Sequence, residues 1–217
     1  MRKENYTYYF SVEGETEKWY LEWLQGCINA SADAKCTVKL DVKIQKDPLV
    51  RVKSMTILGK TEITHVFDRE SEDPVHAQQF LTTLERMNTA QKQGKNIKYV
   101  LGYSNFTFEL WMILHKADCN GGKNHRRQYL APLNAAYHEN FENLDAYKHE
   151  DAFRRVLSKL SLEDVKAAVR RSERLMKSKE ESGFMPQKYN GYAFYTGNPS
   201  LSIWESIKKI LKKCGLL

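Results

Sequence analysis

Acidic residues follow three segments whose aromatic and β-branched composition predicts buried strands. They are Glu13 after residues 6–12, Asp68 and Glu70 after residues 63–67, and Glu109 after residues 97–101. The carboxyl ends of parallel strands share one edge of a sheet, and ligands bind in the crevice there. Clustered carboxylates repel one another unless a cation neutralises them, and hard oxygen ligands suit Mg²⁺ or Mn²⁺. The pattern predicts a divalent-metal site that could bridge a phosphodiester, polarise it and activate water.

Asp68 and Glu70 form the tightest pair within this pattern. Side chains at i and i+2 of an extended segment point the same way, so both carboxylates can face one ion. Each acidic residue taken alone has a more ordinary interpretation, as a helix cap or a solvated turn. Glu15 and Glu17 fit that ordinary role, because the first turn of a helix favours negative charge. The predicted metal site therefore depends on the joint pattern at three strand ends.

Asn105, Glu109 and His115 lie in and around an apolar segment, residues 106–116, that predicts a helix. Glu109 and His115 are six residues apart, which is about 600° of helical rotation, so they do not share a face. We expect Glu109 to point toward the crevice, His115 to cap carbonyl groups, and Asn105, with Ser104, to cap the helix start. The alternative is a supporting role beside the metal ligands, through proton transfer or substrate contact.

A compact basic loop follows a pair of glycines at 121 and 122. Lys123, Arg126 and Arg127 belong to this loop, and glycine lets backbone amides approach a phosphate. We interpret these three side chains as contacts to nucleic acid. The whole chain carries 34 Lys and Arg against 27 Asp and Glu, a net charge of +7, which suits a polyanionic partner.

Ordinary solubility also accounts for a basic surface. Further arginines lie in the helical second half of the chain, at positions 154, 155, 170, 171 and 174. A solvated helix face explains them, and phosphate contact is the alternative.

Alternating strand-like and helical patterns define the elements that position these residues. Strands are predicted at 6–12, 36–45, 63–67 and 97–101, with helices after each of them. This order predicts an α/β fold with a mostly parallel sheet of about four strands flanked by helices. Residues 119–217 show helical spacing, a loop at 183–197 and a last helix at 202–213. We therefore expect an α/β core, residues 1–118, and a helical extension, residues 119–217, that share one hydrophobic core.

Composition excludes several classes of protein. The 217 residues are 41% hydrophobic and include nine Phe, twelve Tyr and four Trp, which is enough apolar area for a core. No stretch approaches the roughly 20 apolar residues of a membrane helix, and the early first strand leaves no room for a signal peptide. The four scattered cysteines favour the cytoplasm. Neither a P-loop nor a zinc-binding spacing occurs.

Four motifs together resemble the RloB family of restriction-linked proteins. They are residues 12–17 (VEGETE), 66–70 (VFDRE), 104–115 (SNFTFELWMILH) and 197–200 (GNPS). Members of that family read approximately EGxxTE, DxD and SNPxFExWxxxH, and the last of these blocks is the specific one. The family is similar to AbiL-type abortive-infection proteins and is related to the Toprim fold of topoisomerases, primases and OLD-family nucleases. The matching segments span residues 6 to about 211.

The resemblance implies a Toprim-like, Mg²⁺- or Mn²⁺-dependent nuclease that acts in bacterial antiphage defence with an ABC- or AAA-type ATPase partner. Glu13 resembles the Toprim glutamate, a general acid/base that is sometimes linked to the metal, and Asp68 and Glu70 resemble the acidic pair that holds the ion. Glu70 stands where the family usually has aspartate, and Phe106 where it usually has proline. The alternative function is a non-catalytic module that binds nucleic acid or the ATPase.

Overall fold

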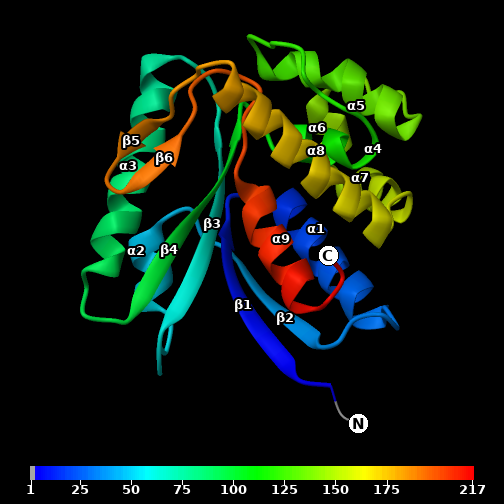
Figure 1. Cartoon of the computed structure of the whole chain (residues 1–217). Coiled ribbons are helices and arrows are strands. Elements are labelled where there is room, and N and C mark those ends of the chain that lie inside the picture. The colour runs from blue at the N-terminus through cyan, green and yellow to red at the C-terminus, as the bar shows by residue number, and fades with distance from the viewer. Residues whose placement is uncertain (1–2) are drawn as a thin grey trace.

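A computed structural model describes residues 3–217, and a parallel sheet of four strands lies at its centre. The strands are β1 (Asn5–Val12), β2 (Thr37–Ile44), β3 (Thr61–Arg69) and β4 (Ile97–Asn105), in the order β2-β1-β3-β4 (Figure 1). The predicted α/β class with a parallel sheet flanked by helices is confirmed. Met1 and Arg2, where the predicted first domain begins, lie outside the described residues.

Helices cover both faces of the sheet (Figure 1). One face carries α2 (Pro48–Lys53), α3 (Pro74–Gln91) and the antiparallel hairpin of β5 (Gln187–Tyr189) and β6 (Tyr192–Phe194). The other face carries α1 (Glu15–Ala30) and the last helix, α9 (Ile203–Lys213). Two clusters of buried side chains fill these layers, one containing Phe67, Phe80 and Phe194 and the other containing Phe10 and Tyr20. The sheet is therefore buried on both faces, as parallel sheets generally are.

A further group of helices packs beside α1. It consists of α4 (Glu109–Lys116), the 3₁₀ helix η1 (Arg126–Tyr129), α5 (Leu130–Tyr137), α6 (Leu144–Lys148), α7 (Glu150–Ser158) and α8 (Leu162–Glu181). Buried residues of these helices, such as Leu114 and Val169, belong to the same cluster as Phe10 of the sheet. Arg171 of α8 closes the end of α4, because its guanidinium donates to the carbonyls of Leu114 (2.8 Å) and His115 (2.9 Å).

Two strands are longer than the sequence predicted, and this moves residues of the candidate site. β3 extends to Arg69, so Asp68 lies within the strand, and β4 extends to Asn105. The expectation that Ser104 and Asn105 cap a helix was therefore wrong. Asp68 pairs with Ser104 and Arg69 with Asn105 across the two strands. These pairs place Ser104 and Asn105 in the sheet, which overrides the local preference of serine and asparagine for caps.

Phe106 forms the turn between β4 and α4. Its φ is +67°, in the left-handed region, and its N–H donates to the carbonyl of Arg69 at 2.8 Å. The helix then begins at Glu109, three residues later than the predicted start at 106. Proline, the residue that the family pattern places here, has φ near −65° and no N–H, so it does not fit this turn.

The segment 183–197 was predicted to be a loop, and it contains the hairpin of β5 and β6. Tyr192 and Phe194 are buried and the intervening Ala193 is exposed, which is the alternation of a half-buried strand. Phe194 packs edge-on against Phe80 of α3, with ring centroids 4.9 Å apart. Strands of three residues are too short for period-2 patterning to reveal them. Within residues 3–217, no helix combines the length and apolar character that a membrane crossing requires.

Candidate metal and phosphodiester site

The carboxyl ends of β1 and β3 bring Glu13 and Asp68 into contact. These strands are neighbours, with Val12 opposite Val66, and Glu13 directly follows β1. The backbone N–H of Asp68 donates to Glu13 Oε2 at 3.3 Å. Asp68 Oδ2 in turn accepts from the backbone N–H of Phe108 at 3.1 Å. One backbone N–H of β3 and one at the start of α4 thus fix the two carboxylates at the edge where ligands bind in parallel sheets.

A pocket of about 240 Å³ opens above these two carboxylates. Its lining residues are Glu13, Gly14, Glu15, Thr16, Glu17, Lys46, Asp68, Glu70, Phe106, Thr107, Arg126 and Lys148. We call this space the acidic pocket, because five of the lining side chains are carboxylates. The residues come from the turn after β1, the start of α1, the segment after β2, the end of β3, the turn before α4, η1 and α6, so distant segments build one site.

Burial and the charge of neighbouring carboxylates raise the pKa values of Asp68, Glu13 and Glu17 in the acidic pocket. The pKa of Asp68 is raised well above its usual value by burial first, and then by the charges of Glu17, Glu13 and Glu109. Burial likewise raises the pKa of Glu13, against the opposing effects of the Asp68 N–H and of Lys46. The folded chain therefore holds negative charge here at a free-energy cost that a bound cation would relieve.

Glu17 also belongs to the site, although its sequence context predicted an ordinary role in the first turn of a helix. Its side chain is buried and lines the acidic pocket, with Oε2 accepting from the Thr16 hydroxyl at 3.1 Å. Burial, and then the charge of Glu109, raise the pKa of Glu17. The sequence did contain a sign that Glu17 is buried, because it lies on the same helix face as Tyr20 and Leu24. An acidic residue on an otherwise apolar face is the informative exception.

Glu109 lies behind the pocket wall. Its side chain is fully buried, Oε2 accepts a hydrogen bond from the Thr107 hydroxyl, and Oε1 lies 3.6 Å from Lys148 Nζ. Burial of Lys148 opposes the charge of its ammonium group. The carboxylates of Glu109, Asp68 and Glu17 outweigh this effect and raise the pKa of Lys148. Lys148 is thus a cation held at the site by α6, a helix of the C-terminal extension. No motif in the sequence indicated this role for Lys148.

Glu70 is at the exposed rim of the acidic pocket. It lines the pocket together with Asp68, as the i, i+2 spacing predicted, but its Oε2 lies 3.5 Å from His76 Nε2. Within residues 3–217, no three Asp, Glu, His or Cys side chains are arranged closely enough to hold a metal ion. The donor chemistry nevertheless fits a hard divalent cation, because Glu13 and Asp68 supply carboxylate oxygens to the same pocket and burial raises the pKa of both.

Asn105 and His115 lie away from the lining of the acidic pocket. The buried Asn105 amide donates to the carbonyls of residues 195, 196 and 197, which fixes the loop before α9. His115 Nδ1 donates to the carbonyl of Trp111 at 2.9 Å, so Nε2 accepts from the hydroxyl of Tyr20 at 3.1 Å. Burial lowers the pKa of His115 to about 4, so the ring is neutral at pH 7. Both side chains organise the packing around the site.

The three predicted basic contacts separate in the structure. Arg126 lines the acidic pocket, and Arg127 lines an adjoining pocket of about 500 Å³ beside Glu70. Lys123 lines neither, and its Nζ lies 5.2 Å from the ring centroid of Tyr129. Lys46 and Lys148 add positive charge to the acidic pocket. The structure therefore brings cations from three separate segments to the carboxylates.

A sequence model of the family described as RloB-like protein matches residues 8–210, which is nearly the whole chain. No curated protein and no solved structure matches the sequence.

Proposed function

The chain belongs to the RloB-like family, and from that premise we propose that it is a divalent-metal-dependent nuclease of the Toprim-like type. The shared pocket of Glu13 and Asp68 carries this proposal, because two carboxylates with raised pKa values that line one pocket are suitable ligands for a cation. Glu13 and Asp68 would hold Mg²⁺ or Mn²⁺, and Glu70 would join them once its carboxylate turns from His76 into the pocket. When bound, such an ion supplies a Lewis acid for phosphodiester hydrolysis.

The chain's own residues would bind the substrate and manage its protons. Arg126, Lys46 and Lys148 line the pocket and would contact the phosphate, whose negative charge increases during hydrolysis. Glu13, whose pKa is raised by burial, would accept and return the proton during hydrolysis. Glu17 and Glu109 keep Lys148 charged and at the pocket wall. The antiphage-defence role and the ABC- or AAA-type ATPase partner implied by the family resemblance belong to the same proposal.

The test is a cleavage assay with Mg²⁺ or Mn²⁺ on plasmid, linear duplex DNA, single-stranded DNA, RNA and tRNA. We expect Glu13→Gln and Asp68→Asn each to reduce cleavage by at least about 100-fold, the scale of losing a group that acts in the transition state. Glu22→Gln, an exposed carboxylate of α1 outside the acidic pocket, serves as the matched control. Full activity in both pocket variants would refute the proposal.

The contact between Glu70 and His76 favours a second candidate, a Toprim-like module that binds nucleic acid or the ATPase without cutting. In this arrangement the third carboxylate is directed to a histidine at the rim. Thermal unfolding with millimolar Mg²⁺ or Mn²⁺ separates the two functions. A metal-dependent rise in Tm that disappears in Asp68→Asn supports the nuclease, and no rise in the wild-type chain supports the module.

A further inference from the structure

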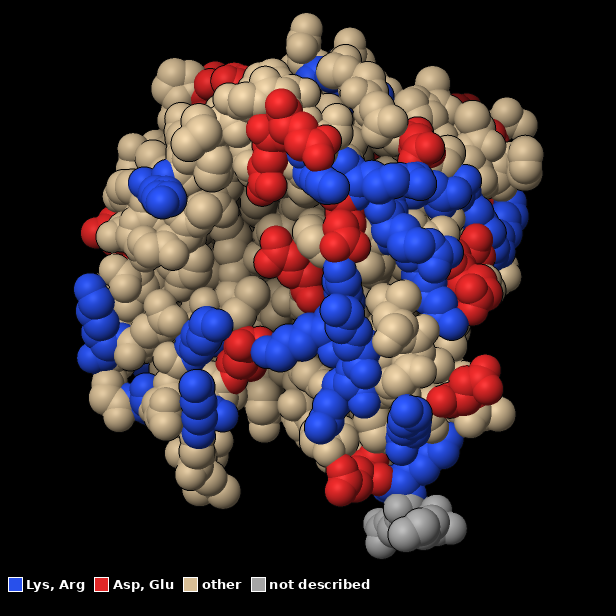
Figure 2. Space-filling model, viewed as in Figure 1, with Lys and Arg blue, Asp and Glu red and all other residues tan. Residues whose placement is uncertain are grey.

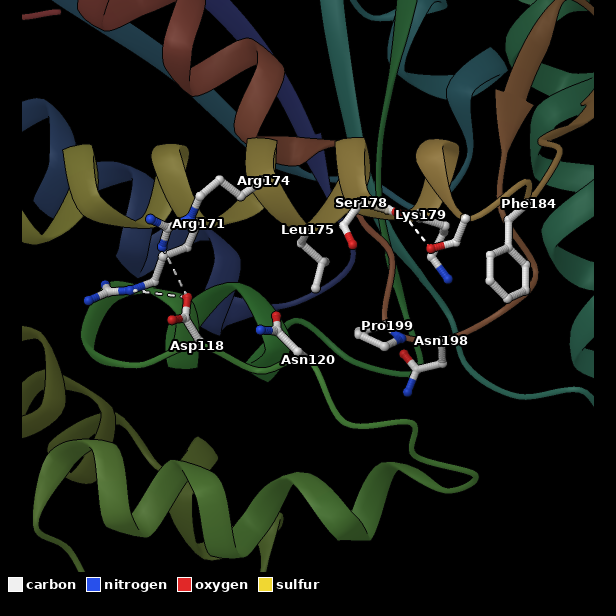
Figure 3. Close-up of a pocket in the computed structure, with 11 residues that line it drawn as sticks. Asp118, Asn120, Arg171, Arg174, Leu175, Ser178, Lys179, Phe184, Asn198 and Pro199 are labelled. Carbon is white, nitrogen blue, oxygen red and sulfur yellow. Dashed lines mark hydrogen bonds and ion pairs between the residues drawn. The ribbon is translucent and has the colours of Figure 1, made fainter.

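A second pocket, of about 560 Å³, runs along α8 and shares no lining residue with the acidic pocket (Figure 3). Its walls are one face of α8, the segment that follows α4, and the loop between β6 and α9. We call it the α8 pocket. Its volume lies within the range of about 300–1,000 Å³ that small-molecule and cofactor sites occupy.

Two guanidinium groups form one end of the α8 pocket. Arg171 and Arg174 lie on the same side of α8, and Asp118 contacts both, at 3.7 Å and 3.3 Å (Figure 3). The side chain of Arg174 is 70% exposed, so its donors are accessible to a ligand. Lys179 is a third cation in the lining, against the single carboxylate of Asp118. Lys and Arg side chains also gather on the surface over α8 and α9, with acidic side chains among them (Figure 2). This end therefore favours an anion.

An aromatic ring forms the opposite end of the α8 pocket. Phe184 is 55% exposed and lies at the far end from the two arginines (Figure 3). Lys179 Nζ lies 4.8 Å from the centroid of its ring. Half-exposed aromatic side chains of this kind bind planar rings, including the bases of nucleotides, by stacking.

Polar groups lie between the two ends, and one of them is held rigidly. Asn198 Oδ1 accepts from the hydroxyl of Tyr129 at 2.7 Å, and its Nδ2 donates to the carbonyl of Lys123 at 3.0 Å. Ser178 of α8 lines the pocket between Arg174 and Phe184 (Figure 3). A fixed wall reduces the entropy that is lost when a ligand binds.

We propose that the α8 pocket binds a nucleoside phosphate, with its phosphate on Arg174, beside the positive charge of Arg171, and its base on Phe184. The order of guanidinium groups, polar side chains and aromatic ring along the pocket matches the order of phosphate, sugar and base. Guanidinium groups bind phosphate oxygens through charge-assisted, often bidentate, hydrogen bonds. The same chemical unit occurs in a free nucleotide and at the phosphorylated end of a strand.

Binding of fluorescent N-methylanthraniloyl-ATP and N-methylanthraniloyl-AMP to the full chain, measured with EDTA present, tests this assignment without any metal. We expect Arg174→Gln and Phe184→Ala each to raise Kd by about tenfold or more. Matched controls are Arg170→Gln, an exposed neighbour in α8, and Met185→Ala, which is 84% exposed beside Phe184. Neither control residue lines the pocket, so both variants should bind within twofold of wild type.

Two further arms identify the source of the ligand and separate this site from the nuclease proposal. Asp68→Asn should bind the nucleotides normally, whether or not the wild-type chain cleaves nucleic acid. Short oligonucleotides with a 5′-phosphate or a 5′-hydroxyl group replace the free nucleotides in the second arm. Binding that requires the 5′-phosphate and Arg174 identifies a strand end, whereas binding of the free nucleotides identifies a soluble ligand. No binding of any probe, or equal weakening in Arg174→Gln and Arg170→Gln, overturns the proposal.

Discussion

The acidic pocket and the α8 pocket differ in the sign of their charge and in how that charge is balanced. In the acidic pocket, Glu13 and Asp68 are fixed by backbone N–H groups, and burial and repulsion raise their pKa values. In the α8 pocket, Arg174 is largely exposed and already has a carboxylate partner in Asp118. The acidic pocket therefore brings buried carboxylates close together, whereas the α8 pocket contains exposed ion pairs.

This difference indicates which of the two pockets lowers the free energy of unfolding. Buried like charges lower the free energy of unfolding, and they persist only where the surrounding structure fixes them. Strand ends provide that fixation at the acidic pocket, since the sheet determines where their backbone groups lie. Exposed ion pairs such as Arg174 with Asp118 contribute little either way. Substitutions in the acidic pocket should therefore change stability much more than substitutions in the α8 pocket.

The largest stability effect is expected at the pair of Glu109 and Lys148. Lys148→Met removes the cation from a fully buried carboxylate, which should lower the free energy of unfolding by about 2 kcal/mol. This expected loss is smaller than the loss for a fully buried ion pair, because the Lys148 side chain is 38% exposed. Urea denaturation at pH 7 measures the change. Adding Glu109→Gln should restore part of the loss, and an unaltered midpoint in Lys148→Met would contradict the importance of this pair.

A smaller effect of opposite sign is expected at Asp68, and it depends on pH. A carboxyl group whose folded pKa is raised binds its proton more tightly in the folded state, so it destabilises the fold above that pKa. Asp68→Asn should therefore be more stable than wild type by about 1 kcal/mol at pH 8 in EDTA. The difference should shrink as the pH falls toward 4. Urea denaturation at pH 8 and pH 5 checks this, and a constant difference would show that Asp68 is not perturbed.

The smallest effect is expected at Asp118 in the α8 pocket. Asp118→Asn removes two contacts to arginines, but these side chains are exposed, so the free energy of unfolding should change by less than about 0.5 kcal/mol. Removal of the only carboxylate in the lining should also tighten the binding of N-methylanthraniloyl-ATP by several-fold. A loss of stability as large as that of Lys148→Met would abolish the distinction between the two pockets.

Much of the acidic pocket could be predicted because strand ends are encoded locally. The apolar runs before Glu13 and Asp68 indicated two strands, and the alternation with helices indicated a parallel sheet, whose edge collects such residues. The local sequence did not predict where β3 and β4 end. Asp68 and Asn105 became strand residues through pairing between β3 and β4, which local preferences for turns and caps do not reveal.

Lys148 shows the limit of sequence reasoning most clearly. It lies in a five-residue helix within the extension, and its role depends on the fold bringing α6 to the end of β3. Arg126 and Lys123 illustrate the same limit, since they are three residues apart but only Arg126 lines the acidic pocket. The backbone turn between neighbouring residues decides where each long side chain reaches, and tertiary packing sets that turn.

The α/β class, the chain order of the first four strands with their helices, and the carboxylates near the strand ends follow from sequence alone, because hydrophobic periodicity and turn chemistry act over short distances. The tertiary structure alone decided that Glu17 and Lys148 join Asp68, that Glu70 pairs with His76, and that a pocket forms along α8. These outcomes depend on contacts between segments far apart in the chain. Such contacts arise when whole helices and strands pack together, and short sequence patterns do not predict this packing.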